Sequence, residues 1–420
     1  MLLSMKSRLT VMSFLQFFIW GAWLLTVANY WFVTKHWDNT EFAAIFSTMG
    51  IASVFMPTLC GIIADRWINA EKLFGALHLL GGITMLFVPL VDNPTDFFWI
   101  ILIAMIFYMP TLALSSSVAY NTLIANQYDV VSVFPPIRVW GTVGFIAATW
   151  VTNLTGNKAS ENQFYISAFV SILLGIYAFT LPACKPMLEK GEKKSFIQTI
   201  GLDAFYLFKT YKMALFFLFS LFLGAALQLT NAYGDVFLSS FKEIPKYADS
   251  FAVKYSTIII SISQISETLF ILAIPFFLKK FGIKKVMLFS LIAWFLRFGL
   301  FAYGNPTDGL WMIILSCIVY GMAFDFFNIS GSLFIEQNTS PTIRSSAQGI
   351  FMMMTNGFGA IIGSLTSGYL IEHFFTLSNG KNDWHSIWLC FALYALVIAV
   401  LFAVLFKHKH EPEKIQTIQH

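Results

Sequence analysis

Long apolar runs alternate with short polar segments along the whole chain. About 20 consecutive apolar residues cross the core of a bilayer as an α-helix, and this measure predicts twelve membrane-spanning helices. The first six are predicted over Val11–Val33, Phe42–Ala64, Leu73–Val91, Phe97–Ala119, Ile137–Leu154 and Phe164–Leu181. The second six are predicted over Met213–Phe237, Tyr255–Leu278, Val286–Ala302, Trp311–Ile335, Ala347–Leu370 and Ile387–Phe406. The pattern therefore predicts an all-α membrane protein.

Composition supports this class, since 57% of the 420 residues are hydrophobic and only 11% are charged, against about 25% charged in soluble domains. The longest polar stretch divides the predicted helices into two groups of six. We therefore expect a six-helix bundle over residues 1–182, a basic cytoplasmic loop over 183–212, a second six-helix bundle over 213–406 and a cytoplasmic tail over 407–420.

Basic residues predict how the chain is oriented in the membrane, because cytoplasmic loops carry an excess of lysine and arginine. With both termini inside, the cytoplasmic segments hold eighteen of the 26 basic residues and the outer loops hold six. Both termini are therefore predicted to be cytoplasmic. The first apolar run is too long for the core of a cleaved signal peptide and is interpreted as a membrane span.

Two short sequence matches indicate an internal repeat. Gly21-Ala22 recurs as Gly224-Ala225, at an offset of 203 residues, and the segment 135–138 recurs as 341–344, at an offset of 206. Offsets near half the chain length are expected of two related helical halves, as in major facilitator transporters. Residues 61–66, with Asp65-Arg66 at their end, resemble the loop signature of that superfamily. The expected architecture is therefore the major facilitator fold.

Three helices of the second half each carry a pair of polar residues three positions apart. Such residues lie on nearly the same face of a helix. The pairs are Gln228 and Asn231, Gln264 and Glu267, and Asp325 and Asn328. A charged side chain at the bilayer centre costs about 2.5–3.5 kcal/mol on insertion scales and normally faces a partner or a water-filled path. The pairs predict a lined cavity, although single amides can also simply join helices.

Arg138 has two interpretations. Its repeat partner, Arg344, starts a predicted span at the membrane surface, so Arg138 would extend to the interface in the same way. Alternatively, Arg138 pairs with Asp325 and connects the two halves. Arg297 is interpreted as structural, because its span is expected to be peripheral, and His78 is interpreted as a hydrogen-bonded core residue.

Aromatic residues next to the polar positions are candidates for stacking on a flat substrate, which gains about 1–3 kcal/mol per base in nucleic-acid proteins. These candidates are Phe145, Tyr320 and Phe324. The four cysteines and seven histidines show no metal-ligand or disulfide spacing. Neither a metal, a cofactor nor an enzyme activity is therefore expected, and the charge of +4 follows membrane topology and indicates no nucleic-acid partner.

Six segments resemble the bacterial nucleoside:proton symporters, the nucleoside permease and xanthosine permease group of the major facilitator superfamily. They are Ser13–Leu25, Phe134–Ile146, Leu227–Ala232, Ser261–Leu278, Tyr320–Ser332 and Ser346–Gly359. The resemblance implies proton-driven nucleoside uptake across the bacterial inner membrane by a protein that we expect to be a monomer. It also implies a set of cavity residues: Arg138, Thr142, Phe145, Gln228, Asn231, Gln264, Glu267, Tyr320, Phe324 and Asp325.

The expected mechanism is alternating access of the two halves around a midplane site. Asp325 is the first candidate for the proton-coupling carboxylate and Glu267 is the second. Two alternatives remain: a proton-coupled sugar permease of the same fold, and a membrane sensor that transports nothing. Uptake of labelled nucleoside distinguishes all three.

Overall fold

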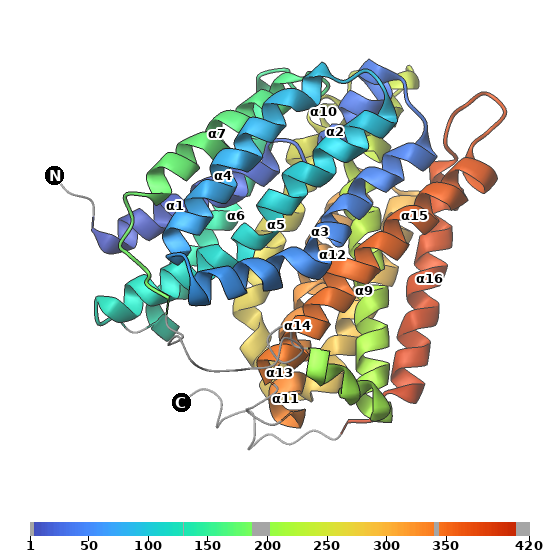
Figure 1. Cartoon of the computed structure of the whole chain (residues 1–420). Helices are drawn as coiled ribbons and strands as arrows, with labels where there is room; N and C mark the ends of the chain where they lie inside the picture. Colours follow the sequence, from blue (N-terminus) through green and yellow to red (C-terminus); the bar gives the residue numbers. More distant parts are fainter. Residues whose placement is uncertain (1–3, 129, 187–201, 340–343, 409–420) are drawn as a thin grey trace. The chain divides into compact units, whose positions relative to one another are not determined.

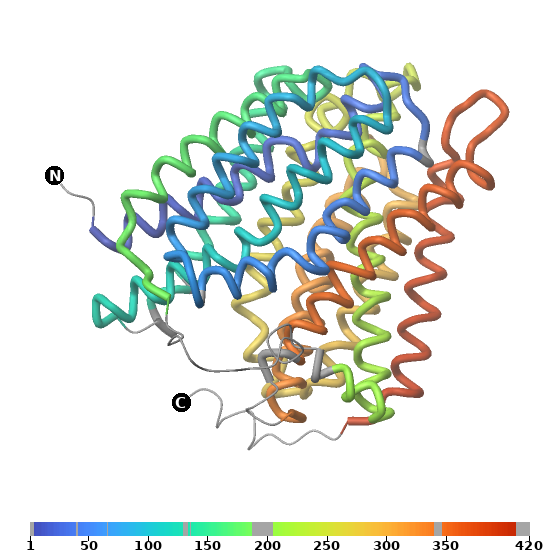
Figure 2. Tube along the Cα trace, in the orientation of Figure 1, coloured from blue at the N-terminus to red at the C-terminus, as the bar shows by residue number. Residues whose placement is uncertain are grey.

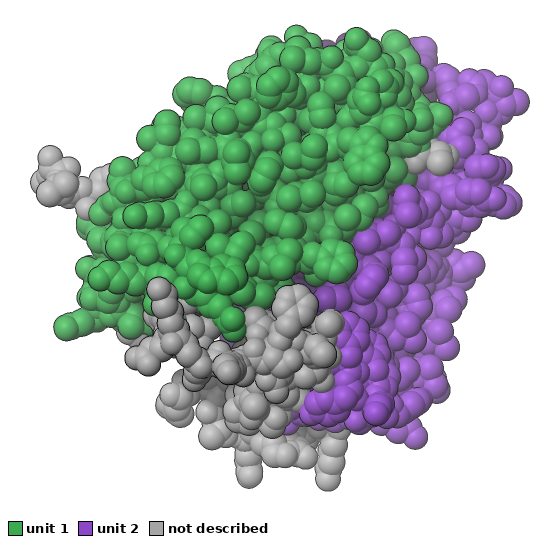
Figure 3. Space-filling model, in the orientation of Figure 1, with its two compact units in different colours: residues 1–199 green, residues 200–420 purple. Residues whose placement is uncertain are grey.

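Helices form nearly all the regular structure in the computed structural model of the chain, which describes residues 4–128, 130–186, 202–339 and 344–408 (Figure 1). Eight helices within these ranges are long and apolar enough to cross a membrane. The predicted all-α membrane class is therefore confirmed. The chain divides into two compact units, residues 1–199 and residues 200–420, which are coloured separately in Figure 3.

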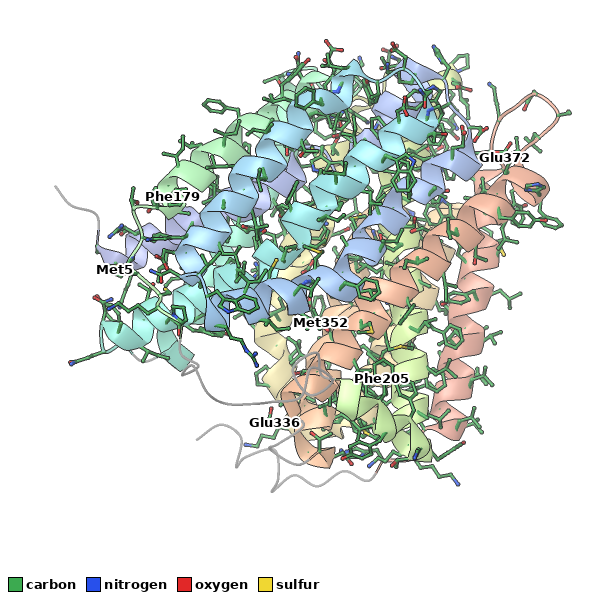
Figure 4. The ribbon with its side chains drawn as sticks, viewed as in Figure 1. Met5, Phe179, Phe205, Glu336, Met352 and Glu372 are labelled. Atoms are coloured by element: carbon green, nitrogen blue, oxygen red, sulfur yellow. The ribbon has the colours of Figure 1, made fainter. Side chains whose placement is uncertain are left out.

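Unit 1 contains the helices of the first half of the chain. They are α1 Met5–Gly21, α2 Val27–Asn29, η1 Tyr30–Lys35, α3 Asn39–Arg66, α4 Ala70–Phe87, η2 Val88–Leu90, α5 Pro94–Ala125, α6 Val130–Leu154 and α7 Asn162–Ala178. Helix α1 begins, and helix α7 ends, at the same end of the unit, where Met5 and Phe179 lie (Figure 4). There the Tyr177 hydroxyl donates to the Arg8 carbonyl at 3.0 Å.

Unit 2 contains the remaining described helices, whose path is followed in Figure 2. They are η3 Leu202–Lys209, α9 Tyr211–Ser240, η4 Phe241–Glu243, α10 Phe251–Lys254, α11 Ser256–Tyr303, α12 Leu310–Ala323, α13 Asp325–Asn338, α14 Arg344–Met352, η5 Met353–Gly359, α15 Ala360–Leu370, η6 Ile371–Phe375 and α16 Trp384–Leu405. Phe205 and Glu336 lie at one end of this unit and Glu372 lies at the other (Figure 4).

Polar side chains at helix N-termini fix where several helices begin, because the first backbone N–H groups of a helix have no partner within it. Asp38 accepts from the backbone N–H of Glu41 at the start of α3. Asn93, directly before Pro94, accepts from the backbone N–H of Asp96 at 2.8 Å at the start of α5. Asp383 caps α16 in the same way. These caps place the helix starts several residues away from the edges of the apolar runs.

Two predicted spans are interrupted in the structure. The first predicted span, Val11–Val33, contains the end of α1 at Gly21 and a turn over residues 22–26. The break is possible because the Thr149 and Thr152 hydroxyls of α6 donate to the Gly21 and Ala22 carbonyls, at 3.3 Å and 3.0 Å. Backbone groups freed inside a membrane need such partners.

The predicted span Trp311–Ile335 is likewise divided, into α12 and α13, at Phe324. The Ser290 hydroxyl of α11 donates to the Ala323 carbonyl at this break. Helix α11 is itself two helices separated by one residue, Gly282, whose φ of 77° is a conformation that glycine adopts without strain. The predicted helices Tyr255–Leu278 and Val286–Ala302 are therefore the two arms of α11.

The repeat predicted from Gly21 and Gly224 has a structural counterpart in each unit. A Cβ atom on Gly21 would overlap the Phe145 carbonyl oxygen of α6, and a Cβ atom on Gly224 would overlap the Thr355 carbonyl oxygen of η5. Each glycine thus lets two backbones approach closely, as small residues do in membrane helix pairs.

The threonines beside these crossings also correspond, because Thr149 and Thr355 are 206 residues apart. Thr149 donates to the Phe145 carbonyl at 2.8 Å, and Thr355 donates to the Phe351 carbonyl at 2.9 Å. The second copy of the other predicted repeat, 341–344, lies largely outside the described residues. Half of the predicted inter-half loop (187–201) and most of the predicted tail (409–420) also lie outside them.

A network of neutral polar side chains lies in the core of unit 1. Gln16 of α1 donates to Thr111 of α5 at 2.8 Å and accepts from His78 Nε2 of α4 at 2.7 Å. The Ser171 hydroxyl of α7 donates to the His78 carbonyl at 2.8 Å. His78 and Gln16 are completely buried. The interpretation of His78 as a hydrogen-bonded core residue is confirmed.

Candidate functional site

The polar pairs predicted from the sequence lie on helices of unit 2. Gln228 and Asn231 belong to α9, and Gln264 and Glu267 belong to the first arm of α11. Gln228 is buried, and the other three are half-buried. Since α9, α11 and α12 pack within one compact unit, these amides and carboxylates are brought into the same part of the molecule.

Two of these amides present unused acceptors. The Oε1 atoms of Gln228 and Gln264 are inaccessible to solvent and have no hydrogen-bond partner within the described part of the chain. A buried acceptor without a partner costs about 1–3 kcal/mol. Natural proteins keep such groups mainly where a ligand or an ordered water completes them. The two amides therefore mark a place where hydrogen-bond donors are accepted.

Tyr320 connects the two acidic candidates. Its side chain is buried on α12, and its hydroxyl lies within electrostatic range of both Glu267 and Asp325. The Tyr320 ring packs edge-on against Trp294 at 5.8 Å between centroids. Three residues that the sequence placed on two separate helices thus belong to one cluster.

Asp325 occupies a particular position in the backbone. It is the first residue of α13, directly after the break at Phe324, and its side chain is 7% exposed. The start of a helix presents backbone N–H groups and the positive end of the helix dipole, both of which favour a carboxylate. Interrupted helices of this kind form the binding sites of many transporters. Sequence periodicity did not reveal this break.

The predicted site residues of unit 1 all lie on α6. Arg138 is exposed and stacks on the Phe17 ring of α1, with its guanidinium carbon 4.0 Å from the ring centroid. Thr142 is half-buried and Phe145 is 9% exposed. Helix α6 begins at Val130, so Arg138 lies two turns inside the helix and not at its start. The interpretation that Arg138 extends to the membrane interface stays a prediction. Its predicted pairing with Asp325 joins residues of different units and stays a prediction.

Arg297 has the structural role predicted for it. The side chain is completely buried on the second arm of α11 and stacks on Tyr320, with its guanidinium carbon 4.4 Å from the ring centroid. It joins neighbouring helices through hydrogen bonds to Thr230, Ser263 and Ser316. The peripheral place predicted for its span stays a prediction.

A second buried carboxylate of unit 2, besides Asp325, was not predicted. Asp235 on α9 is 2% exposed and accepts from the Ser256 hydroxyl at 2.6 Å, at the first residue of α11. The signal was present, since Asp235 follows Gln228 by seven residues and so lies on the same face of α9. Asp235 lies near the end of an apolar run, where carboxylates are common, so its position in the sequence did not mark it as buried.

Comparison with known proteins assigns the family. Residues 3–411 match the family model described as nucleoside H+ symporter. The chain is 50% identical to the nucleoside permease NupG of Escherichia coli (strain K12) over 421 residues, covering 100% of both proteins. It is also 50% identical to the xanthosine permease of the same organism over 415 residues, covering 99% of each.

Solved structures agree with this assignment. Two crystal structures of the nucleoside transporter NupG, one of them a mutant, superpose with TM-scores of 0.93 and 0.89 at 50% identity. The match with the mutant covers 96% of this chain and 100% of the other. The fold predicted from the repeat is thus that of a solved transporter, and the chain belongs to the nucleoside H+ symporter family.

Proposed function

We propose that this protein imports nucleosides together with protons across the bacterial inner membrane. The observation that carries the proposal is the pair of buried amide acceptors, Gln228 and Gln264, beside the cluster of Glu267, Tyr320 and Asp325. A nucleoside is neutral and carries ribose hydroxyls and, in most bases, N–H donors. Such donors would complete the two acceptors, while the site needs no strong positive charge for phosphate.

The proposed topology extends the eight apolar helices to twelve crossings arranged as two six-helix halves. The halves would be residues 1–182 and 213–406, joined by a cytoplasmic loop over 183–212 and followed by a cytoplasmic tail over 407–420. The excess of basic residues in these cytoplasmic segments supports this orientation. We further propose that one copy of the chain suffices for transport.

Substrate binding is proposed to divide between polar and aromatic groups. Gln228, Asn231, Gln264 and Glu267 would bind the ribose and the base edge. Tyr320, Phe324 and Phe145 would offer aromatic faces on which the base stacks. Arg138 and Thr142 of unit 1 would be further contacts of the substrate. The family membership of the chain supports this assignment, because the segments that contain these residues carry the resemblance.

Asp325 is the proposed proton carrier, with Glu267 as the second candidate. Its side chain follows the break at Phe324 and is 7% exposed, so the protein controls its surroundings. Carboxylates buried within membrane spans are typical proton carriers in transporters. In one state of the cycle, ionised Asp325 would pair with Arg138, and protonation would release that pair.

Uptake of labelled uridine into proteoliposomes, with an inward proton gradient and then with a protonophore, tests the function. We expect accumulation above the external concentration that the protonophore abolishes. Inhibition by excess disaccharide instead of excess unlabelled nucleoside would identify a sugar permease. Absence of uptake of either substrate would favour a sensor.

Two conservative substitutions test the roles of the carboxylates. Asp325→Asn should abolish uphill accumulation while sparing exchange, and Glu267→Gln should weaken nucleoside binding. The matched controls are Asp308→Asn and Glu243→Gln, which make the same changes at exposed ion pairs with Lys246 and Lys381. Full proton-driven accumulation by Asp325→Asn, or unchanged affinity of Glu267→Gln, removes that residue from the scheme.

A further inference from the structure

Arg297 links three helical segments of unit 2 from a position with no solvent exposure. Its Nε donates to the Thr230 hydroxyl of α9 at 3.2 Å. Its Nη1 donates to the Ser263 hydroxyl of the first arm of α11 at 3.2 Å and to the Ser316 carbonyl of α12 at 3.0 Å. The Ser316 hydroxyl in turn donates to the Arg297 carbonyl at 2.9 Å. Two of these segments also carry the proposed substrate amides.

The positions of these partners relate Arg297 to the site. Thr230 lies between Gln228 and Asn231 on α9, and Ser263 directly precedes Gln264 on α11. A guanidinium is planar and donates in a fixed fork. By bonding Thr230 and Ser263 at once, Arg297 therefore sets how these two stretches of helix are rotated relative to each other.

Tyr320 is held by the same side chain. The guanidinium stacks on its ring, and the ring is further confined by Trp294 of the same α11 arm. The next residue, Gly321, allows α12 to approach Ser266 of α11 more closely than a Cβ atom would permit. Arg297 thus defines the plane of an aromatic ring that is itself a proposed substrate contact.

The charge of Arg297 is unusual for a residue that only joins helices. In the described ranges no carboxylate lies within 4.0 Å of the guanidinium, and its Nη2 has no hydrogen-bond partner there. A buried cation without a nearby anion is strongly unfavourable. Glu267 and Asp325 act on the same Tyr320 hydroxyl as Arg297, with charge of the opposite sign. A neutral amide would join the same helices without this penalty.

We propose that Arg297 is a positioning residue for nucleoside binding, which fixes the Tyr320 ring and the amide-bearing faces of α9 and α11. The inference rests on the proposed function. It assigns to Arg297 no contact with the substrate, and it predicts that its effect on affinity passes largely through Tyr320.

A double-mutant cycle tests this coupling. The dissociation constant for uridine is measured by calorimetry on the purified full-length protein, for the unmodified chain, Arg297→Gln, Tyr320→Leu and the double variant. Residues in contact couple by amounts that correspond to about tenfold in an equilibrium constant. We expect Arg297→Gln to weaken binding by about tenfold in the unmodified background and by less than about threefold beside Tyr320→Leu.

Two further variants separate positioning from general damage. Arg297→Lys keeps the charge but loses the fork, so its affinity should lie between those of the unmodified protein and Arg297→Gln. Gln16→Leu removes a buried hydrogen-bonding residue of unit 1 and should lower thermal stability without changing the dissociation constant. If Arg297→Gln yields no folded protein, the same cycle is run with Arg297→Lys.

The outcomes are distinguishable. Affinity unchanged by Arg297→Gln, or weakened equally with and without Tyr320→Leu, overturns the role of Arg297 while nucleoside binding by the unmodified protein stands. An unmodified protein that binds no nucleoside overturns the proposed function, and this inference falls with it. A loss of affinity confined to the background that retains Tyr320 supports the positioning role.

Discussion

Each unit joins its helices through a buried polar side chain, but the two side chains differ in charge. In unit 1, four helices meet around His78, whose partners Gln16 and Ser171 are neutral. In unit 2, helices meet around Arg297, whose direct partners are also neutral but whose own charge is permanent. Both side chains are fully or almost fully buried. One network can be complete without any charge, and the other cannot.

This difference indicates where the work of transport is concentrated. A neutral network whose hydrogen bonds are all made rigidifies a core and needs no compensating charge nearby. In unit 2 the tyrosine on which Arg297 stacks also lies within electrostatic range of Glu267 and Asp325. The proposed proton step would change the charge around that tyrosine, whereas nothing in the His78 network needs to change during the cycle.

Introducing a charge into the neutral network gives the largest expected effect. His78→Arg would place a cation beside Gln16 and Ser171, whose hydrogen-bond partners in the described residues are neutral, and an uncompensated buried charge costs about 3–5 kcal/mol. We expect little folded protein by size-exclusion chromatography of a fluorescent fusion. His78→Gln, which stays neutral, is the control. Normal yield of His78→Arg would show that unit 1 tolerates charge as unit 2 does.

The glycine crossings come next, because they recur in both units. Gly21→Ala and Gly224→Ala each place a Cβ atom against a backbone carbonyl, in unit 1 and unit 2 respectively. Overpacking of this kind costs about 1–3 kcal/mol, and both variants should unfold at a lower temperature in detergent. Gly299→Ala, whose Cβ atom meets nothing within 4 Å, should be neutral. A tolerant crossing in either unit would end the structural parallel between them.

Removing a neutral partner tests whether the unit 1 network is purely structural. Gln16→Leu leaves His78 Nε2 and the Thr111 hydroxyl without the partners they have now, at about 1–3 kcal/mol for each unsatisfied buried group. Thermal unfolding followed by tryptophan fluorescence should shift downward, with the dissociation constant for uridine unchanged. A changed affinity would bring the network of unit 1 into the binding machinery.

The smallest effect is expected at the helix caps, of which Asp383 at the start of α16 is an ionisable example in unit 2. The hydrogen bond from Ser386 holds the pKa of Asp383 below its usual value, so this carboxylate stabilises the folded state above the unfolded-state pKa of about 3.9. The contribution is lost as the pH falls through the lower folded-state pKa. Asp383→Ala should cost about 1 kcal/mol at neutral pH and less in acid.

The matched variant in unit 1 is Ser4→Ala, which removes the cap of α1, since Ser4 and its side-chain partner Ser7 are both neutral. Its loss of thermal stability should be the same at pH 7 and at pH 3. Equal pH dependence of the two variants would contradict the assignment of the acid sensitivity to Asp383.

Much of the fold follows from hydrophobicity, because the apolar runs are set by the thickness of the bilayer. The spacing of Gln264 and Glu267 placed both on one helix face, and the match between Gly21 and Gly224 marked two crossings that the structure contains. These features depend on local periodicity or on short identical segments, and both are visible in one sequence.

The features that the sequence did not reveal depend on partners distant in the chain. The breaks after Gly21 and at Phe324 are stabilised by Thr149, Thr152 and Ser290, which belong to other helices. Burial of Arg297 likewise depends on Thr230, which is 67 residues away. The order of helices along the chain carries no information about such side-chain bonds.

The sharp reversal at Gly282 bears on how the protein is made. The two arms of α11 are joined by a single residue with positive φ, so Ser263 and Arg297 face each other across a hairpin only 34 residues apart. Contacts close in sequence form with a small loss of chain entropy. Thr230 and Ser263 both precede Arg297 in the chain, and Ser263 is the hydroxyl partner that Arg297 reaches with the smaller loss of chain entropy, since it lies within the same hairpin.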